Sequence, residues 1–378
     1  MKLSVVIVSY RVYYYIEQCI ESVERAAEGI DHEIFVVDNH SGDGSVEYLR
    51  SRLQKRITLI ECNQNLGFSK ANNIAIRQSK GEYVLLLNPD TFVAENSLRE
   101  VLKFMDDHPH CGGCGAKMHN ADGTLARESR RGIPTPWVAL KKMLGFSARY
   151  YLSHLSWDQP AQIEAMSGAF CMLRREAIDK VGMLDEDFFM YGEDLDLSYR
   201  LLKGGYENWY VPADIVHYKG ESTQKSSFRY VHVFYQAMLI FFRKHYAHTS
   251  WVVSLPIKLG IYLRAMVALV QMTYWNARLS LGFVDKEKKS PEYVFVGSDS
   301  MLDECRELSR RKGMTATFLS SPPASKDCAQ DPMPCIVYDT DTFSYAQVIE
   351  MAVACSPARI GTYSRKTHIL ITPTEIIR

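Results

Sequence analysis

The stretch from Asp185 to Arg200 has the densest group of side chains able to do acid–base chemistry. Glu193, Asp194 and Asp196 precede leucines with helical spacing, so we expect these acids in a first helical turn, where the helix macrodipole favours negative charge. Capping explains one such acid. However, residues 185–187 place a second acidic cluster just upstream, and the two clusters repel each other unless a cation or a proton uses them. A carboxylate with a raised pKa there suits a general base.

The elements that must position these acids begin at the N-terminus. Short apolar runs predict strands, and helical spacing predicts helices between them. The expected strands are residues 3–8, 33–37, 57–61 and 83–88, and the expected helices are 13–27, 45–52 and 69–79. This alternation predicts an α/β fold with a mostly parallel sheet and helices on both faces. Ligands of such sheets lie beyond the carboxyl ends of the strands.

Polar segments follow all four expected strands, at the edge where that rule places a ligand. An Asp directly after a buried strand can accept hydrogen bonds from a base or a ribose, and glycines let the backbone turn tightly. Each segment alone is an ordinary turn. Their shared position predicts a nucleotide-binding edge, formed by Ser9–Arg11, Asp38–Gly44, Asn63–Phe68 and Asn88–Asp90.

Composition excludes some partners. At 378 residues and 47% hydrophobic content, the chain can bury a large core and a second, smaller one. Its 44 basic and 44 acidic residues cancel, and without a basic run we expect no nucleic-acid partner. The nine cysteines include one close pair, Cys111 and Cys114, which lacks the second pair of a zinc site. We expect free thiols, a strand instead of a signal peptide at the N-terminus, and a cytoplasmic location.

The middle of the chain has a looser pattern. Residues 112–113, 120–123 and 127–131 indicate turns and a sheet edge. Arg130 and Arg131 either neutralise a phosphate or belong to a solvated loop, and the loop is the more common case. Tyr150, Tyr151 and Trp157 suit a flap over an acceptor.

We expect three parts: a catalytic domain at 1–245, a helical segment at 246–284 and a small α/β domain at 285–378. Residues 231–245 have an amphipathic helical pattern. Residues 251–283 are apolar, but their charges leave no uncharged run of the roughly 20 residues that a spanning helix needs. These helices either lie in a bilayer interface or pack on the neighbouring domain.

The C-terminal part has expected strands at 293–297, 315–319, 335–338 and 369–371 and helices at 301–312 and 345–355. Gly297 and Ser298 follow the first of these strands. Because the full glycine fingerprint of a dinucleotide site is missing, we expect no cofactor in this domain.

Over about residues 3–245 the chain resembles the family-2 glycosyltransferases of the GT-A fold, in particular rhamnosyltransferase-like members that build bacterial surface polysaccharides. No single motif is specific, but their order and spacing are. The motifs are 4–10 (SVVIVSY), 36–39 (VVDN), 65–68 (NLGF), 71–73 (ANN), 85–91 (LLLNPDT), 167–169 (SGA), 185–200 and His217.

The resemblance implies a nucleoside-diphosphate-sugar donor and a divalent metal, Mg²⁺ or Mn²⁺. Asp38 would read the pyrimidine ring, and Asp90 would be the last acid of the family's Asp-x-Asp metal motif. His217 would add a second metal contact, although alone it is equally typical of a core histidine. Asp194 would be the catalytic base of the pair with Glu193. The implied donor-binding residues are Ser9, Arg11, Asp38, Asn65, Gly67, Asn72, Asn88, Asp90 and Gly168.

Two departures from the family pattern matter. Position 88 is Asn where the family has its first metal-motif acid, so one metal contact becomes a neutral oxygen or a water. The Gln-x-x-Arg-Trp motif of processive synthases is absent after Asp194, which favours addition of one or a few sugars. We expect the acceptor to be a glycan, lipid-linked at the inner face of the membrane, with peripheral membrane contact.

Physical chemistry supports the same interpretation. A departing diphosphate needs charge stabilisation from a hard cation, and an attacking hydroxyl needs a carboxylate to take its proton. One displacement inverts the anomeric configuration. A sugar-phosphate nucleotidyltransferase remains an alternative, but it should have a glycine-rich basic loop at residues 10–14, where this chain has Tyr-Arg-Val-Tyr-Tyr. A non-catalytic nucleotide-sugar-binding protein would need no aligned acids.

Overall fold

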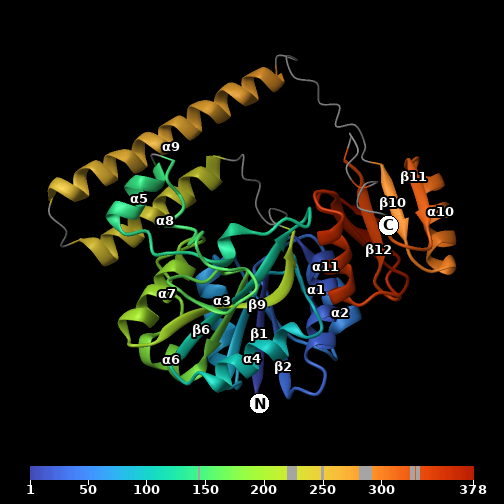
Figure 1. The fold of residues 1–378 in the computed structure, drawn as a ribbon, viewed down its shortest axis with the longest axis horizontal. Helices are drawn as coiled ribbons and strands as arrows, with labels where there is room; N and C mark the ends of the chain where they lie inside the picture. The colour runs from blue at the N-terminus through green and yellow to red at the C-terminus, as the bar shows by residue number, and fades with distance from the viewer. Residues whose placement is uncertain (144, 219–227, 248–250, 281–291, 324–327, 329–332) are drawn as a thin grey trace.

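Figure 1 shows the fold of the protein in a computed structural model, which describes residues 1–143, 145–218, 228–247, 251–280, 292–323, 328 and 333–378. A large mixed sheet fills the N-terminal part, a smaller sheet forms the C-terminal part, and a layer of helices lies across one end. The two sheets have separate strand orders, so they are distinct units.

The large sheet has the spatial order β3-β2-β1-β4-β8-β6-β9-β5, with β7 paired to β9. Strands β1 to β4 are parallel, as predicted, and β8 runs antiparallel between β4 and β6. Its strands are β1 (Leu3–Ser9), β2 (His32–Asp38), β3 (Thr58–Glu61), β4 (Tyr83–Leu87), β5 (Thr91–Val93), β6 (Cys111–Asn120), β7 (Ala161–Ile163), β8 (Phe170–Arg174) and β9 (Glu207–His217).

Helices cover both faces of this sheet, and alternate residues of β1 show why. Val5 and Ile7 point into a core shared with α1 and α4, whereas Val6 and Val8 point into the opposite core with α3. The buried run of β1 therefore serves two cores. The helices are α1 (Tyr13–Ala26), α2 (Ser45–Leu53), α3 (Phe68–Gln78), α4 (Ser97–Asp107), α6 (Arg175–Val181) and α7 (Glu193–Lys203), with a 3-10 turn η1 (Arg127–Ser129).

The prediction of turns at Gly112 and Gly113 was wrong, because both residues lie inside β6 in the middle of the sheet. A Cβ at Gly112 would approach the Tyr206 Cβ to 2.7 Å, and one at Gly113 would approach the Met166 Cε to 2.6 Å. These glycines allow close packing of neighbouring side chains against the strand.

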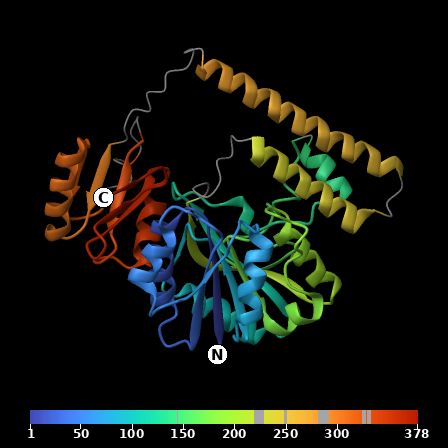
Figure 2. The same ribbon diagram turned by 180° about the vertical axis from the view of Figure 1, so that it is seen from behind.

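Three helices form the layer at one end: α5 (Pro136–Met143), α8 (Phe228–Tyr246) and α9 (Trp251–Ser280). Both α5 and α8 contact α9, and Figures 1 and 2 show α9 farthest from the large sheet. No helix in the described ranges is long and apolar enough to cross a membrane.

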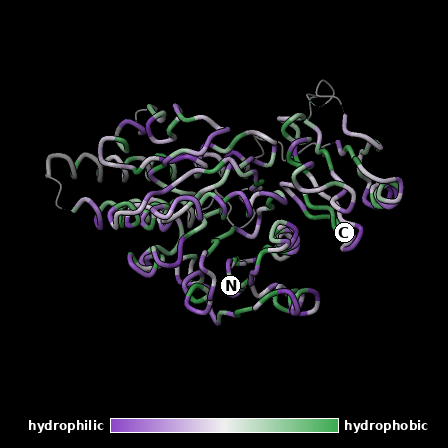
Figure 3. The backbone as a smooth tube through the Cα atoms, turned by 60° about the horizontal axis from the view of Figure 1, so that its bottom comes forward, coloured by the Kyte–Doolittle hydropathy of each residue, from purple (hydrophilic) through white to green (hydrophobic). Residues whose placement is uncertain are grey.

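The C-terminal sheet has the order β11-β10-β12-β13-β14-β15, and its apolar strands appear green near the C-terminus in Figure 3. The sequence predicted its main elements but missed the buried strand β13, because Arg-Ile-Gly-Thr-Tyr-Ser contains no apolar run. The elements are β10 (Tyr293–Val296), α10 (Asp299–Lys312), β11 (Ala316–Leu319), β12 (Cys335–Asp339), α11 (Tyr345–Ala354), β13 (Arg359–Ser364), β14 (Ile369–Ile371) and β15 (Ile376–Ile377).

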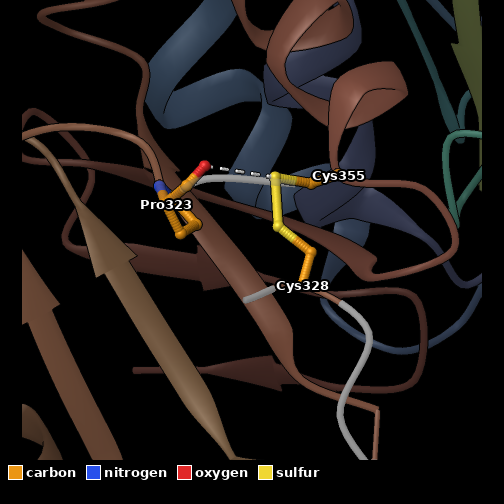
Figure 4. Close-up of a disulfide and its surroundings, with 3 residues drawn as sticks. All are labelled: Pro323, Cys328 and Cys355. Atoms are coloured by element: carbon orange, nitrogen blue, oxygen red, sulfur yellow. Dashed lines mark hydrogen bonds between the residues drawn. A yellow bond between two sulfur atoms is a disulfide. The ribbon is translucent and has the colours of Figure 1, made fainter. Parts of the chain in front are cut away.

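The expectation that every cysteine is a free thiol was wrong for one pair. Cys328 and Cys355 form a disulfide, with their Cα atoms 5.3 Å apart (Figure 4). They are 27 residues apart in sequence, and only the packing at the end of α11 brings them together. Cys111 and Cys114 are free and buried, with sulfurs 3.4 Å apart.

Candidate functional site

The ends of β1 and β2 place Ser9 and Asp38 opposite each other in register, as predicted. Asp38 is 3% exposed, and its carboxylate accepts hydrogen bonds from the Ser41 backbone N–H at 3.1 Å and the Ser41 hydroxyl at 2.6 Å. Arg11 has a left-handed backbone (φ 61°), and its N–H donates to the Ser41 Oγ at 3.0 Å. These residues therefore share one loop cluster, which Asp38 organises.

Asn65 and Gly67 lie beside this cluster, in the loop before α3. The Asn65 Oδ1 accepts from the Gly67 N–H at 3.0 Å and from the Asn39 Nδ2 at 3.1 Å. Gly67 has φ 81°, and a Cβ there would lie 2.4 Å from the Phe189 carbonyl oxygen, so only glycine fits. Phe68 N–H donates to that same oxygen at 2.7 Å. The loop is therefore joined to the acidic stretch at 185–200.

Asn72 does not reach this edge through its donor group. It is 1% exposed, and its Nδ2 donates to the Phe68 carbonyl one turn earlier at 2.9 Å. Asn73, which sequence reasoning left without a role, donates to the Leu184 carbonyl at 2.8 Å and the Glu186 carboxylate at 3.0 Å. The two asparagines thus anchor α3 to its own loop and to the acidic stretch.

Asn88, Asp90 and His217 converge because β5 pairs with the end of β9. The His217 Nε2 lies 3.3 Å from the Asp90 Oδ1 and 3.3 Å from the Asn88 Nδ2. Asp90 is 2% exposed, and its buried Oδ1 accepts no hydrogen bond from any described residue.

This arrangement fits an open metal site. Neighbouring ligands at about 2.1 Å from one octahedral ion lie about 3 Å apart, close to the Asp90–His217 spacing. Within the described part of the chain, no group of three or more His, Cys, Asp or Glu forms a complete metal cage. An ion held here would therefore take further oxygens from a substrate or from water.

Asp194 lies at the start of α7, as predicted. Tyr191 (φ 68°) and Gly192 (φ 84°) turn the chain into the helix through two left-handed residues. The Asp194 Oδ2 accepts from the Arg131 Nη2 at 2.6 Å and from the Gly168 N–H at 3.1 Å. Because the next residue, Ala169, accepts a hydrogen bond from the Asn88 N–H at 3.1 Å, residues 168–169 join Asp194 to the loop of Asn88 and Asp90.

The neighbouring acids have structural partners. Asp196 is ion-paired with Arg200 and hydrogen-bonded to the His245 Nε2 of α8, each at 2.7 Å. Lys244 pairs with Asp185 and Asp187, and Arg77 pairs with Glu186 at 2.9 Å. The upstream acidic cluster is therefore neutralised by cations of α3 and α8.

Glu193 differs from these acids. It is 6% exposed, and its Oε2 has no hydrogen-bond partner in the described structure. Burial first, and then the charge of Asp194, raise the pKa of Glu193 well above its usual range. The raised pKa expected in this stretch therefore belongs to Glu193.

Arg131 is the functional residue that the solvated-loop interpretation missed. Arg130 and Arg131 are both buried; the Arg130 guanidinium stacks 3.5 Å from the Trp157 ring centre, and Arg131 also bonds the Met166 carbonyl. The available signal was indirect, because an acidic cluster at 193–196 requires cations from elsewhere in the sequence.

A cavity of about 360 Å³ lies beside Asp194. Its walls come from the α7 N-terminus, from α5 and its flanking loops, and from one side of α8. Tyr150, predicted to lie in a flap over the acceptor, is buried and lines this cavity. The candidate base therefore faces a space large enough for part of a substrate.

Comparisons with known proteins find similar sequences among glycosyltransferases. An N-acetylglucosaminyl-diphospho-decaprenol L-rhamnosyltransferase of Mycobacterium tuberculosis (strain ATCC 25618 / H37Rv) is 27% identical over 270 residues, which cover 66% of this chain and 86% of the relative. Rhamnosyltransferase WbbL of Escherichia coli (strain K12) is 26% identical over 185 residues, covering 44% and 70%.

Among solved structures, mannosyltransferase PcManGT from Pyrobaculum calidifontis, in complex with GDP-Man and Mn²⁺, aligns with a TM-score of 0.46 and 18% identity. The alignment covers 82% of this chain and 81% of that one. Residues 4–182 match the family model described as glycosyl transferase family 2. This matched part carries the four strand-end segments and most of the mixed sheet, so residues 4–182 are similar to glycosyl transferase family 2.

Proposed function

We propose that the protein is an inverting glycosyltransferase that moves a sugar, with rhamnose as the leading candidate, from a nucleoside-diphosphate sugar to a hydroxyl of a lipid-linked glycan. The product would serve bacterial surface polysaccharide or O-antigen synthesis, on the cytoplasmic side of the membrane. One observation carries the proposal: Asp194 faces a cavity and is joined through Gly168 and Ala169 to the loop of Asn88 and Asp90.

In this proposal the strand-end edge binds the donor. Ser9, Arg11 and Asp38 form the nucleotide side, while Asn65 and Gly67 hold the adjoining loop and Asn72 supports it from α3. The similar mycobacterial rhamnosyltransferase is named for a diphospho-decaprenol acceptor, and the PcManGT structure contains GDP-Man. Both are consistent with this assignment.

Asp90 and His217, with Asn88 beside them, would hold Mg²⁺ or Mn²⁺. Such an ion supplies positive charge next to the leaving diphosphate. The carboxylate of Asp90 is suited to this because it is buried and its Oδ1 receives no hydrogen bond.

Asp194 would accept the proton of the acceptor hydroxyl during a single displacement at the anomeric carbon, which inverts its configuration. The ion pair with Arg131 and the Gly168 N–H fix the carboxylate in place. Glu193 would remain protonated next to it.

We also propose that the chain works as three parts, with the catalytic domain at 1–245, the helical segment at 246–284 and the C-terminal domain at 285–378. The helical segment would contact the membrane peripherally. No role in the chemistry is assigned to the C-terminal domain.

Asp194→Asn tests the proposal, because Asn keeps the size of the side chain but cannot take the proton. We expect kcat for sugar transfer, or for donor hydrolysis with several nucleotide sugars, to fall by about two to four orders of magnitude. Donor binding should be retained, and removal of Mn²⁺ and Mg²⁺ with EDTA should abolish turnover of the unsubstituted enzyme.

Asp187→Asn is the matched control, since this acid of the same stretch is exposed and pairs with Lys244. Normal turnover by Asp194→Asn would remove Asp194 from the chemistry. Full activity in EDTA would contradict the metal assignment.

A further inference from the structure

The cavity next to Asp194 has an apolar side built mainly by α8. This side includes large side chains that follow one another at helical spacing, so α8 presents them as one wall. The α8 residues of this wall include Phe234, Ala237, Met238, Phe241 and Phe242, and Pro134, Ala139 and Leu195 add apolar surface from other segments. A sugar alone is polar, so it would provide no apolar surface to pack against this wall.

The opposite side of the cavity carries two cations, Arg131 and Lys142. Arg131 is ion-paired with Asp194 at 2.6 Å. The Lys142 Nζ lies 3.4 Å from the centre of the Tyr150 ring, and among the described residues no carboxylate is within ion-pairing distance of it. Lys142 is therefore a partly buried cation that forms no ion pair within the described part of the chain, although the charge of Glu128 acts on it.

The environment of Lys142 supports this view. Burial first, and then repulsion from Arg131, lower the pKa of Lys142 to about 8, and the negative charge of Glu128 only partly offsets them. An anionic group placed in the cavity would relieve that repulsion and favour the charged amine.

We propose that this cavity binds a phosphorylated lipid, with a phosphate or diphosphate beside Lys142 and the first part of an apolar chain against the α8 wall. This assignment rests on the proposed function, because it names the part of a lipid-linked acceptor that adjoins its sugar. The sugar hydroxyl would then lie toward Asp194, which lines the same cavity.

The charged side chains that line the cavity are Arg131, Lys142, Glu193 and Asp194. Arg131 is paired with Asp194 and the pKa of Glu193 is raised, so Lys142 is the lining cation left to attract an anionic ligand. The sequences of the surrounding helices α5, α8 and α9 contain Lys or Arg and no Asp or Glu. The ligand chemistry, a phosphate on an apolar chain, has two sources: an isoprenoid carrier and a bilayer phospholipid. The α8 wall and the closeness of Asp194 favour the carrier.

Farnesyl diphosphate, with the full-length protein and equilibrium binding measured by calorimetry, is a suitable probe. We expect it to bind at least about tenfold more tightly than farnesol or inorganic diphosphate, since each of these satisfies only one side of the cavity. Lys142→Gln should weaken binding about tenfold, and Lys142→Arg should retain it.

Lys141→Gln is the matched control, because this neighbouring lysine of α5 is exposed and does not line the cavity. Met238→Gln, which conserves volume at the wall, should weaken binding of farnesyl diphosphate but not of inorganic diphosphate. Equal loss in Lys141→Gln and Lys142→Gln, or no loss in either, would overturn the assignment of Lys142.

Vesicles of phosphatidylglycerol distinguish the two lipid sources. In competition with labelled farnesyl diphosphate, these vesicles are compared with the unlabelled compound. If both displace the labelled compound equally well, the cavity binds bilayer lipid and the carrier assignment is wrong. Donor hydrolysis by the unsubstituted protein separates this proposal from the proposed function, because it needs no lipid: normal hydrolysis of a nucleotide sugar without binding of farnesyl diphosphate would overturn the cavity assignment alone. Lack of any donor turnover in the unsubstituted protein would instead refute the proposed function.

Discussion

Glu193 and Asp194 are adjacent in sequence but lie in different surroundings. Asp194 accepts hydrogen bonds from Arg131, Gly168 and its own helix, whereas the buried Oε2 of Glu193 has no partner among the residues that the structure describes. Burial, and then the negative charge of Asp194, raise the pKa of Glu193. Such divergence between paired carboxylates is typical of acid–base sites. In the proposed function, Asp194 is the carboxylate that takes the proton of the acceptor.

Glu193→Gln should make the protein more stable than the unsubstituted chain, by an amount that depends on pH. The folded-state pKa of Glu193 is raised, so ionisation is penalised only in the folded state. The difference should be absent below about pH 4, grow as pH rises above the pKa of an unfolded Glu, and level off above the folded-state pKa. Thermal unfolding between pH 4 and 9 measures it, with an expected difference of a few degrees in Tm.

Glu186→Gln is the control for this series. Glu186 is paired with Arg77 and its pKa is lowered, first by its hydrogen bond from Asn73. Its substitution should therefore remove stability at neutral pH, in the opposite direction. A pH-independent difference for Glu193→Gln would mean that this side chain is ionised or solvated in the fold.

At the scale of elements, α9 combines an apolar exposed stripe with a purely basic set of charges. Leu259 is 65% exposed, Tyr262 61% and Val270 62%, and Trp275 at the far end is 51% exposed. Exposed Trp137 and Phe146 lie on and just beyond α5, which packs against α9. An exposed apolar stripe of this length marks an interaction surface, and its aromatic and basic residues suit a bilayer interface containing anionic lipids.

Replacing Tyr262 and Trp275 together with Ser should reduce binding to phosphatidylglycerol vesicles about tenfold, which corresponds to about 1.4 kcal/mol. Vesicle flotation measures this. Val353→Ser is the matched control, because Val353 is exposed on α11 of the C-terminal sheet unit, away from this stripe. Unchanged flotation, together with loss of a dimer in sedimentation, would show that the stripe binds a second copy of the chain.

At the scale of the whole molecule, the C-terminal sheet unit packs against the edge of the large sheet near the metal-site residues. Phe92 of β5 and Tyr218, which follows His217, share a core with Tyr345 of α11. The carboxylate of Glu95 accepts the N–H groups of Tyr345 at 2.7 Å and Ala346 at 2.9 Å. A side chain of one unit thus caps a helix of the other.

Glu95→Gln should weaken this contact, because a neutral amide offers one acceptor oxygen and no charge to the helix N-terminus. We expect a loss of about 1–2 kcal/mol in the free energy of unfolding. Chemical denaturation measures it, and Glu100→Gln, an exposed residue one turn into α4, is the control. Identical curves for both variants would mean that the cap does not stabilise the docked arrangement.

The local sequence pattern determined the first strands of the large sheet and the positions of several candidate site residues. Buried β-branched runs and their polar ends predicted β1 to β4 and the positions of Asp38, Asp90 and Asp194, because strand period and helix capping depend on neighbouring residues. The family resemblance then located the expected donor-binding residues, and their roles remain predictions.

Only tertiary structure decided the partners of those residues. Arg131 reaches Asp194 across 63 positions, and His217 reaches Asn88 across 129. Three predictions were wrong for one shared reason. They are the turn at Gly112 and Gly113, the solvated loop at Arg131 and the free thiols at Cys328 and Cys355. Close packing, burial of a charge and formation of a disulfide depend on which distant segments meet, and local periodicity carries no information about that.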